Sequence, residues 1–516
     1  MTFKELSEYL EKLEETSSRL SLIDILSDLF KKAKDSDELE KIIYLIQGRI
    51  APFFENLEIG MAEKTVAQSI ANAYGKEREE VLKLYEKEGD MGKTVEKLCS
   101  GNYKGYLTLK VEEVFSVLTQ IARTSGAGTV EKRQTLLSDL LKRVDSQSAK
   151  FIVRIPLGNL RLGIGDPTTL DGLASAILGD KSKRKLLEGA YNRTSDLGLI
   201  GKTLKSHGLS AVEKLEVQVG KPIRSELCER LPNPEKVIEK MKTVDAQFKI
   251  DGFRVQIHKD KDKVSMFSRN LENMTHMFPE LIDATLKQVK AKTAILDTEA
   301  LAYNVESEEF LPFQETTKRR RKHNISEVAA KLPLKAFVFD ILYKDGKSLI
   351  DLPLSKRMEI LKETIKDDGT LIRAKNQIIS DPKTLTILLE DSISKGLEGV
   401  VVKKLDSPYE AGARNFNWVK LKRHSAGELN DTIDCVILGY ITGKGKRTAF
   451  GAGALLVGIY NPKKDEFVTV SKIGTGLSDE EWREIHKRAD KIRLDHKPAR
   501  VNSLIVPSVW IEPKIV

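Results

Sequence analysis

The stretch from Phe248 to His258 (FKIDGFRVQIH) restricts the fold more than any other part of the sequence, because its hydrophobic alternation changes parity midway. The apolar residues before Asp251 have even numbers, and those after Gly252 have odd numbers. Side chains alternate strictly along a pleated strand, so the switch predicts a strand that stops at Asp-Gly, turns and resumes. We therefore expect Lys249, Asp251 and Arg254 to gather around the turn, in front of an apolar wall.

Lys249 at this turn is a candidate nucleophile. A lysine amine attacks phosphorus only after it has lost its proton, which a partly desolvated site with cationic neighbours favours. The alternative is a surface hairpin that carries a solvated lysine, and for an isolated Lys-x-Asp-Gly pattern this alternative is the usual outcome. Other motifs must therefore decide between the two.

The pattern Lys249-x-Asp251-Gly252-x-Arg254 resembles the adenylylation motif of ATP-dependent DNA ligases, in which the lysine carries AMP through a phosphoramidate. RNA ligases and mRNA capping enzymes share this short pattern. A longer series is more specific, because it matches the ligase motifs in order and in approximate spacing: Lys249, Arg269, Glu299, Phe339, Glu398 and Lys420. The resemblance is to ligases of the archaeal or eukaryotic type, and it extends over essentially all 516 residues.

This resemblance implies roles for single residues. It makes Lys249 the catalytic nucleophile, stacks Phe339 on adenine, and brings Gln247 to the adenine amino group, where many relatives have glutamate. Glu299 and Glu398 are implied as metal-associated carboxylates, with Glu299 also in the nucleotide site. The other residues implied to bind nucleotide or phosphate are Arg254, Arg269, Lys403, Arg414 and Lys420. The cofactors implied are ATP and Mg²⁺, with Mn²⁺ as an alternative metal.

The strand patterns around these residues favour similar chemistry. Asp297 and Glu299 share one strand face, where two carboxylates can hold a hard cation or bind a ribose hydroxyl; exposed acids on an edge strand are the alternative. Lys420 and Lys422 also share a face and repel each other unless an anion such as triphosphate lies between them; a solvated face is the alternative. The aromatic and aliphatic positions of the next strand are expected to face one way: Phe337, Phe339, Ile341 and Tyr343.

Residues 1 to about 215 predict helices almost throughout, because apolar residues recur at spacings of three and four. Loops 123–128 (RTSGAG) and 154–166 (RIPLGNLRLGIGD) place glycine beside basic groups and predict a surface that binds phosphates without reading bases; ordinary turns are the alternative. These segments resemble the helical DNA-binding domain of archaeal and eukaryotic DNA ligases, which argues against capping enzymes and most RNA ligases. Gln47–Phe54 has the spacing of a sliding-clamp-binding peptide, with helix packing as the alternative.

The expected architecture is multidomain: an all-α DNA-binding domain (1–215), an α+β nucleotidyltransferase or adenylation domain (216–427), and a β-rich OB-fold domain (428–516). In the resembled family the chain continues past the equivalent of Trp510–Lys514 into further strand and a basic motif. The OB-fold is therefore expected to be incomplete, with an open barrel. The basic cluster Lys318–Lys322 is expected to form a solvated or DNA-facing loop.

Composition restricts the setting only loosely. A net charge of +9, from 85 basic and 76 acidic residues, is compatible with nucleic acid binding but does not establish it. The three cysteines have no metal-ligand spacing and predict reduced thiols, and no apolar run approaches membrane-spanning length. The expectation is a soluble monomer of the cytoplasm, associated with the nucleoid, with no membrane partner.

The expected function is the ATP-dependent sealing of nicks between a 5′-phosphate and a 3′-hydroxyl in duplex DNA. It would proceed through lysyl-AMP and DNA-adenylate, in replication, repair and recombination. Two alternatives remain from the sequence: RNA ligation or capping, and a non-catalytic protein that only binds nicks.

Overall fold

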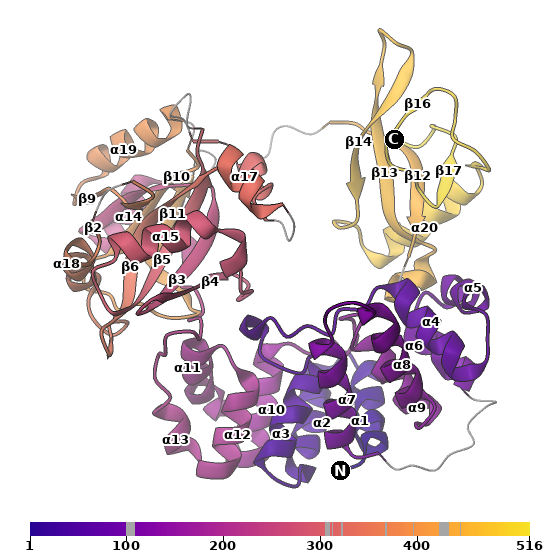
Figure 1. The fold of residues 1–516 in the computed structure, drawn as a ribbon. Coiled ribbons are helices and arrows are strands. Elements are labelled where there is room, and N and C mark those ends of the chain that lie inside the picture. Colours follow the sequence, from indigo (N-terminus) through magenta and orange to yellow (C-terminus); the bar gives the residue numbers. More distant parts are fainter. Residues whose placement is uncertain are drawn as a thin grey trace.

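The structure, a computed structural model, describes residues 1–99, 109–304, 310–311, 313–320, 324–366, 369–395, 397–422, 433–443 and 445–516. Only helices occur as regular elements in the described residues before β1, strands and helices are mixed from β1 to β11, and a mainly β unit begins at β12 (Figure 1). This order confirms the predicted fold class. The expected boundary between residues 427 and 428 lies outside the described residues.

The helical unit is built from amphipathic helices. In α1, one apolar stripe of Phe3, Leu6, Leu10 and Leu13 is buried, and Thr2 caps the helix through a reciprocal capping box with Glu5. The elements of this unit are α1 Phe3–Glu15, α2 Arg19–Lys32, α3 Ser36–Ile46, η1 Phe53–Glu55, α4 Glu63–Tyr74, α5 Arg78–Glu88, α6 Met91–Cys99, α7 Val111–Arg123, α8 Thr129–Leu141, α9 Ser146–Arg154, α10 Asp166–Leu178, η2 Lys181–Lys183, α11 Arg184–Thr194, α12 Leu197–His207 and α13 Leu209–Glu213.

One part of the predicted phosphate-binding surface is wrong. Arg154 is buried, with its guanidinium 2.9 Å from Glu14 and 3.1 Å from Asp90. Arg161 also pairs with Asp90, at 3.1 Å. These arginines hold α9 against α1 and the start of α6, so they are not available as free phosphate ligands. Arg123, by contrast, ends α7 at an exposed loop before α8, and phosphate binding by this loop stays a prediction.

The mixed unit contains two sheets packed near each other, with strand orders β1-β11-β10-β2-β9 and β4-β3-β5-β6-β7. Its elements are β1 Leu227–Arg230, α14 Pro234–Met241, β2 Val244–Lys249, β3 Phe253–Asp260, β4 Lys263–Ser268, η3 Thr275–Met277, α15 Pro279–Gln288, β5 Thr293–Ala302, α16 Phe313–Thr317, α17 Ile325–Lys331, β6 Leu334–Lys344, β7 Lys347–Ser348, α18 Leu354–Thr364, β8 Leu371–Arg373, β9 Asn376–Ile379, α19 Pro382–Ser394, β10 Gly399–Lys404 and β11 Arg414–Lys422. β8 also pairs with β6, in parallel, although it is not part of the strand order given for the second sheet.

The predicted break at Asp251-Gly252 is confirmed, but it is a crossing and not a hairpin. β2 ends at Lys249 in the first sheet, and β3 begins at Phe253 in the second. A Cβ at Gly252 would lie 2.3 Å from the carbonyl oxygen of Ala300 in β5, so glycine is required for this close approach. The alternative of a surface hairpin is therefore wrong.

The expected alternation along β6 is interrupted. The register between β5 and β6 shifts twice, and one of the two shifts places Ile341 in a different hydrophobic core from Tyr343. Each shift is a bulge that turns the following side chains to the other face. Phe337 and Phe339 both line one cavity, whereas Ile341 belongs to the hydrophobic core that includes Val338.

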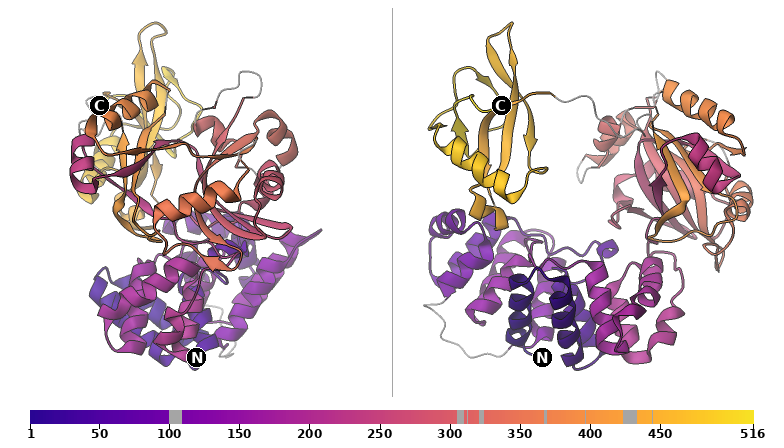
Figure 2. Two further views of the ribbon diagram at one scale, coloured as in Figure 1. Left: turned by 90° about the vertical axis from the view of Figure 1, so that its left-hand side faces the viewer. Right: turned by 180° about the vertical axis from the view of Figure 1, so that it is seen from behind.

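The third unit is a sheet of order β15-β17-β12-β13-β14-β16 with one long helix. Its elements are β12 Val436–Thr442, η4 Gly445–Phe450, β13 Ala452–Asn461, β14 Glu466–Ile473, α20 Asp479–Asp490, β15 Arg493–Leu494, β16 Val501–Asn502 and β17 Val509–Ile511. The mixed and β-rich units stand over opposite ends of the helical unit (Figure 2). Thr448 lies against Gly89 after α5, and a Cβ at Gly89 would fall 2.3 Å from Thr448 Oγ1. Among the described residues, no helix is both long and apolar enough to cross a bilayer.

A buried ion pair supports the mixed unit behind β6. Arg357 of α18 donates from Nε to Asp340 Oδ1 at 2.8 Å and from Nη2 to Oδ2 at 3.0 Å, and both side chains are fully buried. Such a pair contributes little net stability, but removal of one partner leaves an uncompensated charge.

We therefore expect Arg357→Met to lower the free energy of unfolding by about 3–5 kcal/mol, and the double variant Asp340→Leu/Arg357→Met to recover most of that loss. Denaturant unfolding followed by tryptophan fluorescence measures both. Lys356→Met is the control, because the neighbouring Lys356–Glu359 pair is exposed and should matter by less than about 1 kcal/mol. Equal losses in the single and double variants would contradict the uncompensated-charge explanation.

Candidate functional site

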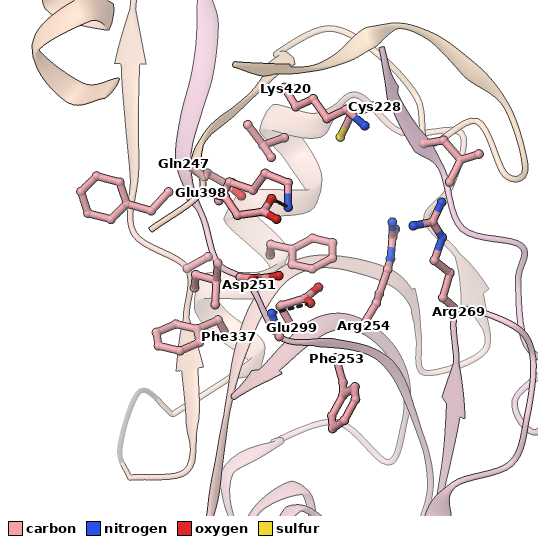
Figure 3. A pocket seen from close by; sticks show the side chains of 18 of the residues that line it. Cys228, Gln247, Asp251, Phe253, Arg254, Arg269, Glu299, Phe337, Glu398 and Lys420 are labelled. Atoms are coloured by element: carbon pink, nitrogen blue, oxygen red, sulfur yellow. Dashed lines mark hydrogen bonds and ion pairs between the residues drawn. The ribbon is translucent and has the colours of Figure 1, made fainter. Parts of the chain in front are cut away.

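A cavity of about 500 Å³ opens between the two sheets of the mixed unit, at the crossing from β2 to β3 (Figure 3). Both sheets contribute to its walls. Every side chain that the sequence singles out for the site lines it: Gln247, Lys249, Arg254, Arg269, Glu299, Phe339, Glu398, Lys403, Arg414 and Lys420. Residues far apart in the sequence are thus brought to one place.

Lys249 reaches the cavity from the last position of β2. Its Nζ forms an ion pair with Glu398, which directly precedes β10, and Lys422 of β11 binds the same carboxylate at 2.9 Å. Burial opposes ionisation of Glu398, but the hydrogen bonds from both lysines outweigh it and lower the pKa of this carboxyl. The carboxylate therefore stays charged and holds the two ammonium groups near each other.

Glu299 faces the cavity from β5, the strand between β3 and β6, so the alternative of exposed acids on an edge strand is wrong. Glu299 Oε1 accepts from the backbone N–H of Gly252 at 3.2 Å. Burial raises the pKa of Glu299 to about 7, although Arg254 and Lys249 favour its charged form. Near neutral pH this carboxyl is poised between its two protonation states.

Arg254 is fixed by protein groups beneath the cavity. Its Nε donates to Asp297 at 3.0 Å, Nη1 to the carbonyl of Glu226 at 2.9 Å, and Nη2 to the Tyr409 hydroxyl at 3.2 Å. Tyr409 in turn donates to Asp297 at 2.8 Å. Asp297, which shares a strand face with Glu299, thus anchors the arginine, and most donors of Arg254 are already used.

An aromatic wall closes one side of the cavity. Phe339 meets Trp418 edge to face at 6.0 Å, and the guanidinium of Arg254 lies 5.3 Å from the Phe339 ring. Lys403 is almost fully buried between these two rings, and its Nζ donates to the Phe339 carbonyl at 3.1 Å. Burial lowers the pKa of Lys403. The wall offers a flat apolar face with a cation behind it, which suits a purine ring.

Cations surround the mouth of the cavity. Lys420 lies on β11, and burial together with Arg230 lowers its pKa. Arg414, at the start of β11, is exposed and donates to the Cys228 carbonyl at 3.2 Å. Arg269 follows β4 and lines this cavity as well as a second one of about 600 Å³ next to the helical unit. An anion entering the mouth meets positive charge from β11 and from the segment after β4.

Several lining residues were not assigned from the sequence. Lys422 shares a strand face with Lys420, and Phe337 shares the parity of Phe339, so the alternation did contain a signal for both. Arg320 carried no such signal, because its segment was expected to be a solvated loop. In the structure Arg319 is fully buried and paired with Glu280, whereas Arg320 lines the cavity and pairs with Glu272 at 2.6 Å. The expectation of a solvated loop is therefore wrong for Arg319, and residues 321–322 lie outside the described residues.

The site could hold a hard divalent cation only if a bound phosphate supplies further oxygen donors. Within the described ranges, no group of three or more His, Cys, Asp or Glu side chains could hold a metal by itself. Mg²⁺ is commonly held by one or two carboxylates plus substrate phosphates. Glu299 and Glu398 line one cavity and provide oxygen donors of this kind.

The candidate clamp-binding segment is folded into the helical unit. Ile50 and Phe54, which would be its apolar anchors, are buried. Phe54 packs edge to face on Phe267 of β4 at 6.3 Å, and Arg49 lies 3.5 Å from the Phe53 ring. Packing accounts for these residues in this structure.

Comparison with known proteins identifies one family along the chain. Family models described as "DNA ligase N terminus", "ATP dependent DNA ligase domain" and "ATP dependent DNA ligase C terminal region" match residues 2–174, 225–422 and 448–516. A "Probable DNA ligase" of Dictyoglomus turgidum is 47% identical, and a "DNA ligase" of Saccharolobus solfataricus is 39% identical. Each match covers 100% of this chain and 88% of the relative. A solved structure titled "Pmar-Lig_Pre." has a TM-score of 0.56 at 17% identity, covering 94% of this chain and 91% of that one, which supports the fold.

The raised pKa of Glu299 gives a test of the site's electrostatics. We expect its side-chain carboxyl ¹³C resonance to titrate near pH 7, and the resonance that disappears in Glu299→Gln identifies it. Because the folded pKa exceeds the unfolded one, the folded chain retains this proton between about pH 4.5 and 7. The contribution of Glu299 to stability therefore falls as the pH rises through that window. A midpoint near the ordinary value of 4.5 would show that burial at this position has little effect.

Proposed function

The chain belongs to the ATP-dependent DNA ligase family, whose members seal nicks through adenylate intermediates, and on this premise we propose that Lys249 is the residue that carries AMP. The observation that supports this assignment is the position of Lys249 at the end of β2, inside the cavity and beside Glu398. No other described lysine of the cavity both ends a strand at the crossing and follows the motif pattern.

In the proposed first step the lone pair of Lys249 Nζ attacks the α-phosphorus of ATP. The bond from this phosphorus to the bridging oxygen breaks, and pyrophosphate leaves with the electron pair. The ammonium proton must leave before attack, and the ion pair with Glu398 holds the Lys249 side chain in the cavity until then. Lys420 and Lys422 offer positive charge to the phosphate oxygens, so the reaction depends mainly on positioning and charge stabilisation.

The later steps follow from the chemistry of the family. The 5′-phosphate of the nick attacks the lysyl-AMP phosphorus and releases the lysine, and the 3′-hydroxyl then displaces AMP and closes the strand. We assign Arg269 and Arg414 to the phosphates at this stage, because both lie at the mouth of the cavity. We assign Phe339 to the adenine, because its ring forms the aromatic wall.

We also propose that Glu299 and Glu398 bind Mg²⁺ together with the triphosphate, with Mn²⁺ as an alternative. When bound, the cation would neutralise phosphate charge and polarise the phosphorus–oxygen bonds. Glu299 would contribute best after it has lost its proton, above about pH 7. Glu398 would have to exchange its lysine partners for the cation.

The domain roles complete the proposal. We propose that residues 1–215 bind the nicked duplex, 216–427 carry out adenylylation, and 428–516 form the OB-fold that acts with them, all within a monomer. Nicked double-stranded DNA is the partner. Sliding-clamp binding through Gln47–Phe54 remains a prediction, and it would require Ile50 and Phe54 to leave their buried positions.

The nucleophile is tested by substitution. Lys249→Ala and Lys249→Arg should both abolish covalent AMP transfer from radiolabelled ATP while binding of nicked DNA persists, because a guanidinium stays protonated and cannot attack phosphorus. Lys347→Ala, at an exposed position of β7, is the matched control and should charge normally. Covalent AMP on the alanine variant would move the nucleophile elsewhere. An unmodified chain that binds nicked DNA but acquires no AMP would support the nick-binding alternative.

The role of the helical unit is tested by salt dependence. Residues 216–516 alone should bind nicked duplex more weakly than the whole chain and with a shallower fall of affinity as salt increases, since each phosphate contact adds about 0.9 to the log–log slope. Fluorescence anisotropy at several ionic strengths measures both quantities. Charging of the fragment with AMP shows that its catalytic part is folded. Indistinguishable slopes would remove DNA binding from residues 1–215.

A further inference from the structure

Two neighbouring side chains of β2, one of which lines the cavity, are joined by a hydrogen bond that the reaction does not require. Asp245 and Gln247 alternate with Lys249 along β2, so all three project from the same face of the strand. Gln247 Nε2 donates to Asp245 Oδ2 at 3.0 Å, and both residues are buried. Gln247 lines the cavity (Figure 3), and it precedes Lys249 by two residues on β2.

This hydrogen bond fixes which end of the amide faces the cavity. An ionised carboxylate only accepts hydrogen bonds, so the NH₂ group of Gln247 must point toward Asp245. Within the described part of the chain, Asp245 Oδ1 meets no donor at good hydrogen-bond geometry, although the Asn376 side chain lies near enough to help lower the pKa of Asp245. Reversal of the Gln247 amide would leave Oδ2 without its donor as well. Gln247 Oε1 is left for the cavity, and no described residue donates to it.

The charge of Asp245 is itself supported from the next strand. Lys403 lies opposite Asp245 in the antiparallel register of β10 and β2. Burial raises the pKa of Asp245, and the nearby ammonium group of Lys403 opposes this shift. Lys403 cannot move far, because its Nζ also donates to the Phe339 carbonyl beneath the aromatic wall. The orientation of the Gln247 amide therefore depends on Asp245 of β2 and on Lys403 of β10.

We propose that Asp245 is a positioning residue that selects the base, by holding Gln247 Oε1 toward the cavity as an acceptor for the exocyclic amine of adenine. The inference rests on the proposed nucleotide site between Lys249 and Phe339. A purine with a carbonyl at the same position, such as guanine or hypoxanthine, would place an acceptor against an acceptor. An amide without this neighbour could turn over and accept either base.

The size of the effect follows from an unpaired buried group. Leaving one buried acceptor without a donor typically costs enough to change binding about tenfold to a hundredfold. We expect the unmodified chain to bind α,β-methylene-ATP about ten times or more tightly than α,β-methylene-ITP, whose hypoxanthine differs at this position. Isothermal titration calorimetry with these analogues measures binding alone, because neither can charge Lys249.

Two variants separate positioning from a general structural role. In Asp245→Asn the new amide can donate or accept, so Gln247 is satisfied in either orientation, and the ATP-to-ITP preference should fall about tenfold toward equality. In the exchanged pair Asp245→Asn/Gln247→Glu, the amide of the introduced asparagine donates to one oxygen of the introduced glutamate, which has only acceptor atoms. A carboxylate oxygen again faces the cavity, and the preference should return.

The outcomes are distinct. Equal losses of affinity for both analogues in Asp245→Asn, or no return of preference in the exchanged pair, would overturn the inference and leave Asp245 a structural residue. If Asp245→Asn unfolds, the ATP-to-ITP preference is compared between the exchanged pair and the unmodified chain alone. Equal affinities of the unmodified chain for the two analogues would also reject the inference. Covalent charging with labelled ATP, measured separately, tests Lys249 without reference to Asp245.

Discussion

The backbone contact between Gly252 and β5 is the constraint on which the site depends. A side chain at Gly252 would collide with the carbonyl of Ala300, so only glycine lets the chain leave one sheet and enter the other at this point. The same contact brings the Gly252 N–H to Glu299. Lys249 and Glu299 belong to different sheets, and this single crossing brings both to one cavity. A larger residue would separate the nucleophile from the carboxylate even if both sheets remained intact.

The second constraint is electrostatic. Lys249 and Lys422 are held together by Glu398, and Lys420 and Arg414 add positive charge at the mouth of the cavity. Like charges on one strand face repel, so this arrangement stores repulsion that one carboxylate offsets only in part. A bound triphosphate would offset the rest. On the proposed function, this excess of positive charge favours a polyphosphate in the cavity. The Asp340–Arg357 pair supports β6 behind it.

The sequence allowed much of this to be predicted, and its errors have clear physical causes. The parity switch predicted the break in the strand, but alternation is a local signal and cannot tell whether the next strand joins the same sheet. The motif series predicted a set of residues that do line one cavity. Bulges in β6 then separated Ile341 from Phe339, because a bulge depends on pairing with β5. The positive charge of Arg154 and Arg319 also led to the wrong prediction that their side chains are exposed. Each is buried against carboxylates from distant segments, which the local sequence does not reveal.

The position of Arg269 connects recognition of DNA with the chemistry. It lines the nucleotide cavity and also the neighbouring cavity of about 600 Å³, whose walls include Arg49 and Arg224. Arg224 joins the two units, since it binds Asp166 of α10 at 3.0 Å and the Tyr191 hydroxyl of α11 at 2.7 Å. The second cavity is thus bounded by the helical unit and opens beside the first. If the helical unit binds the duplex as proposed, a nick phosphate in the second cavity would be separated from the cavity of Lys249 by Arg269, which lines both.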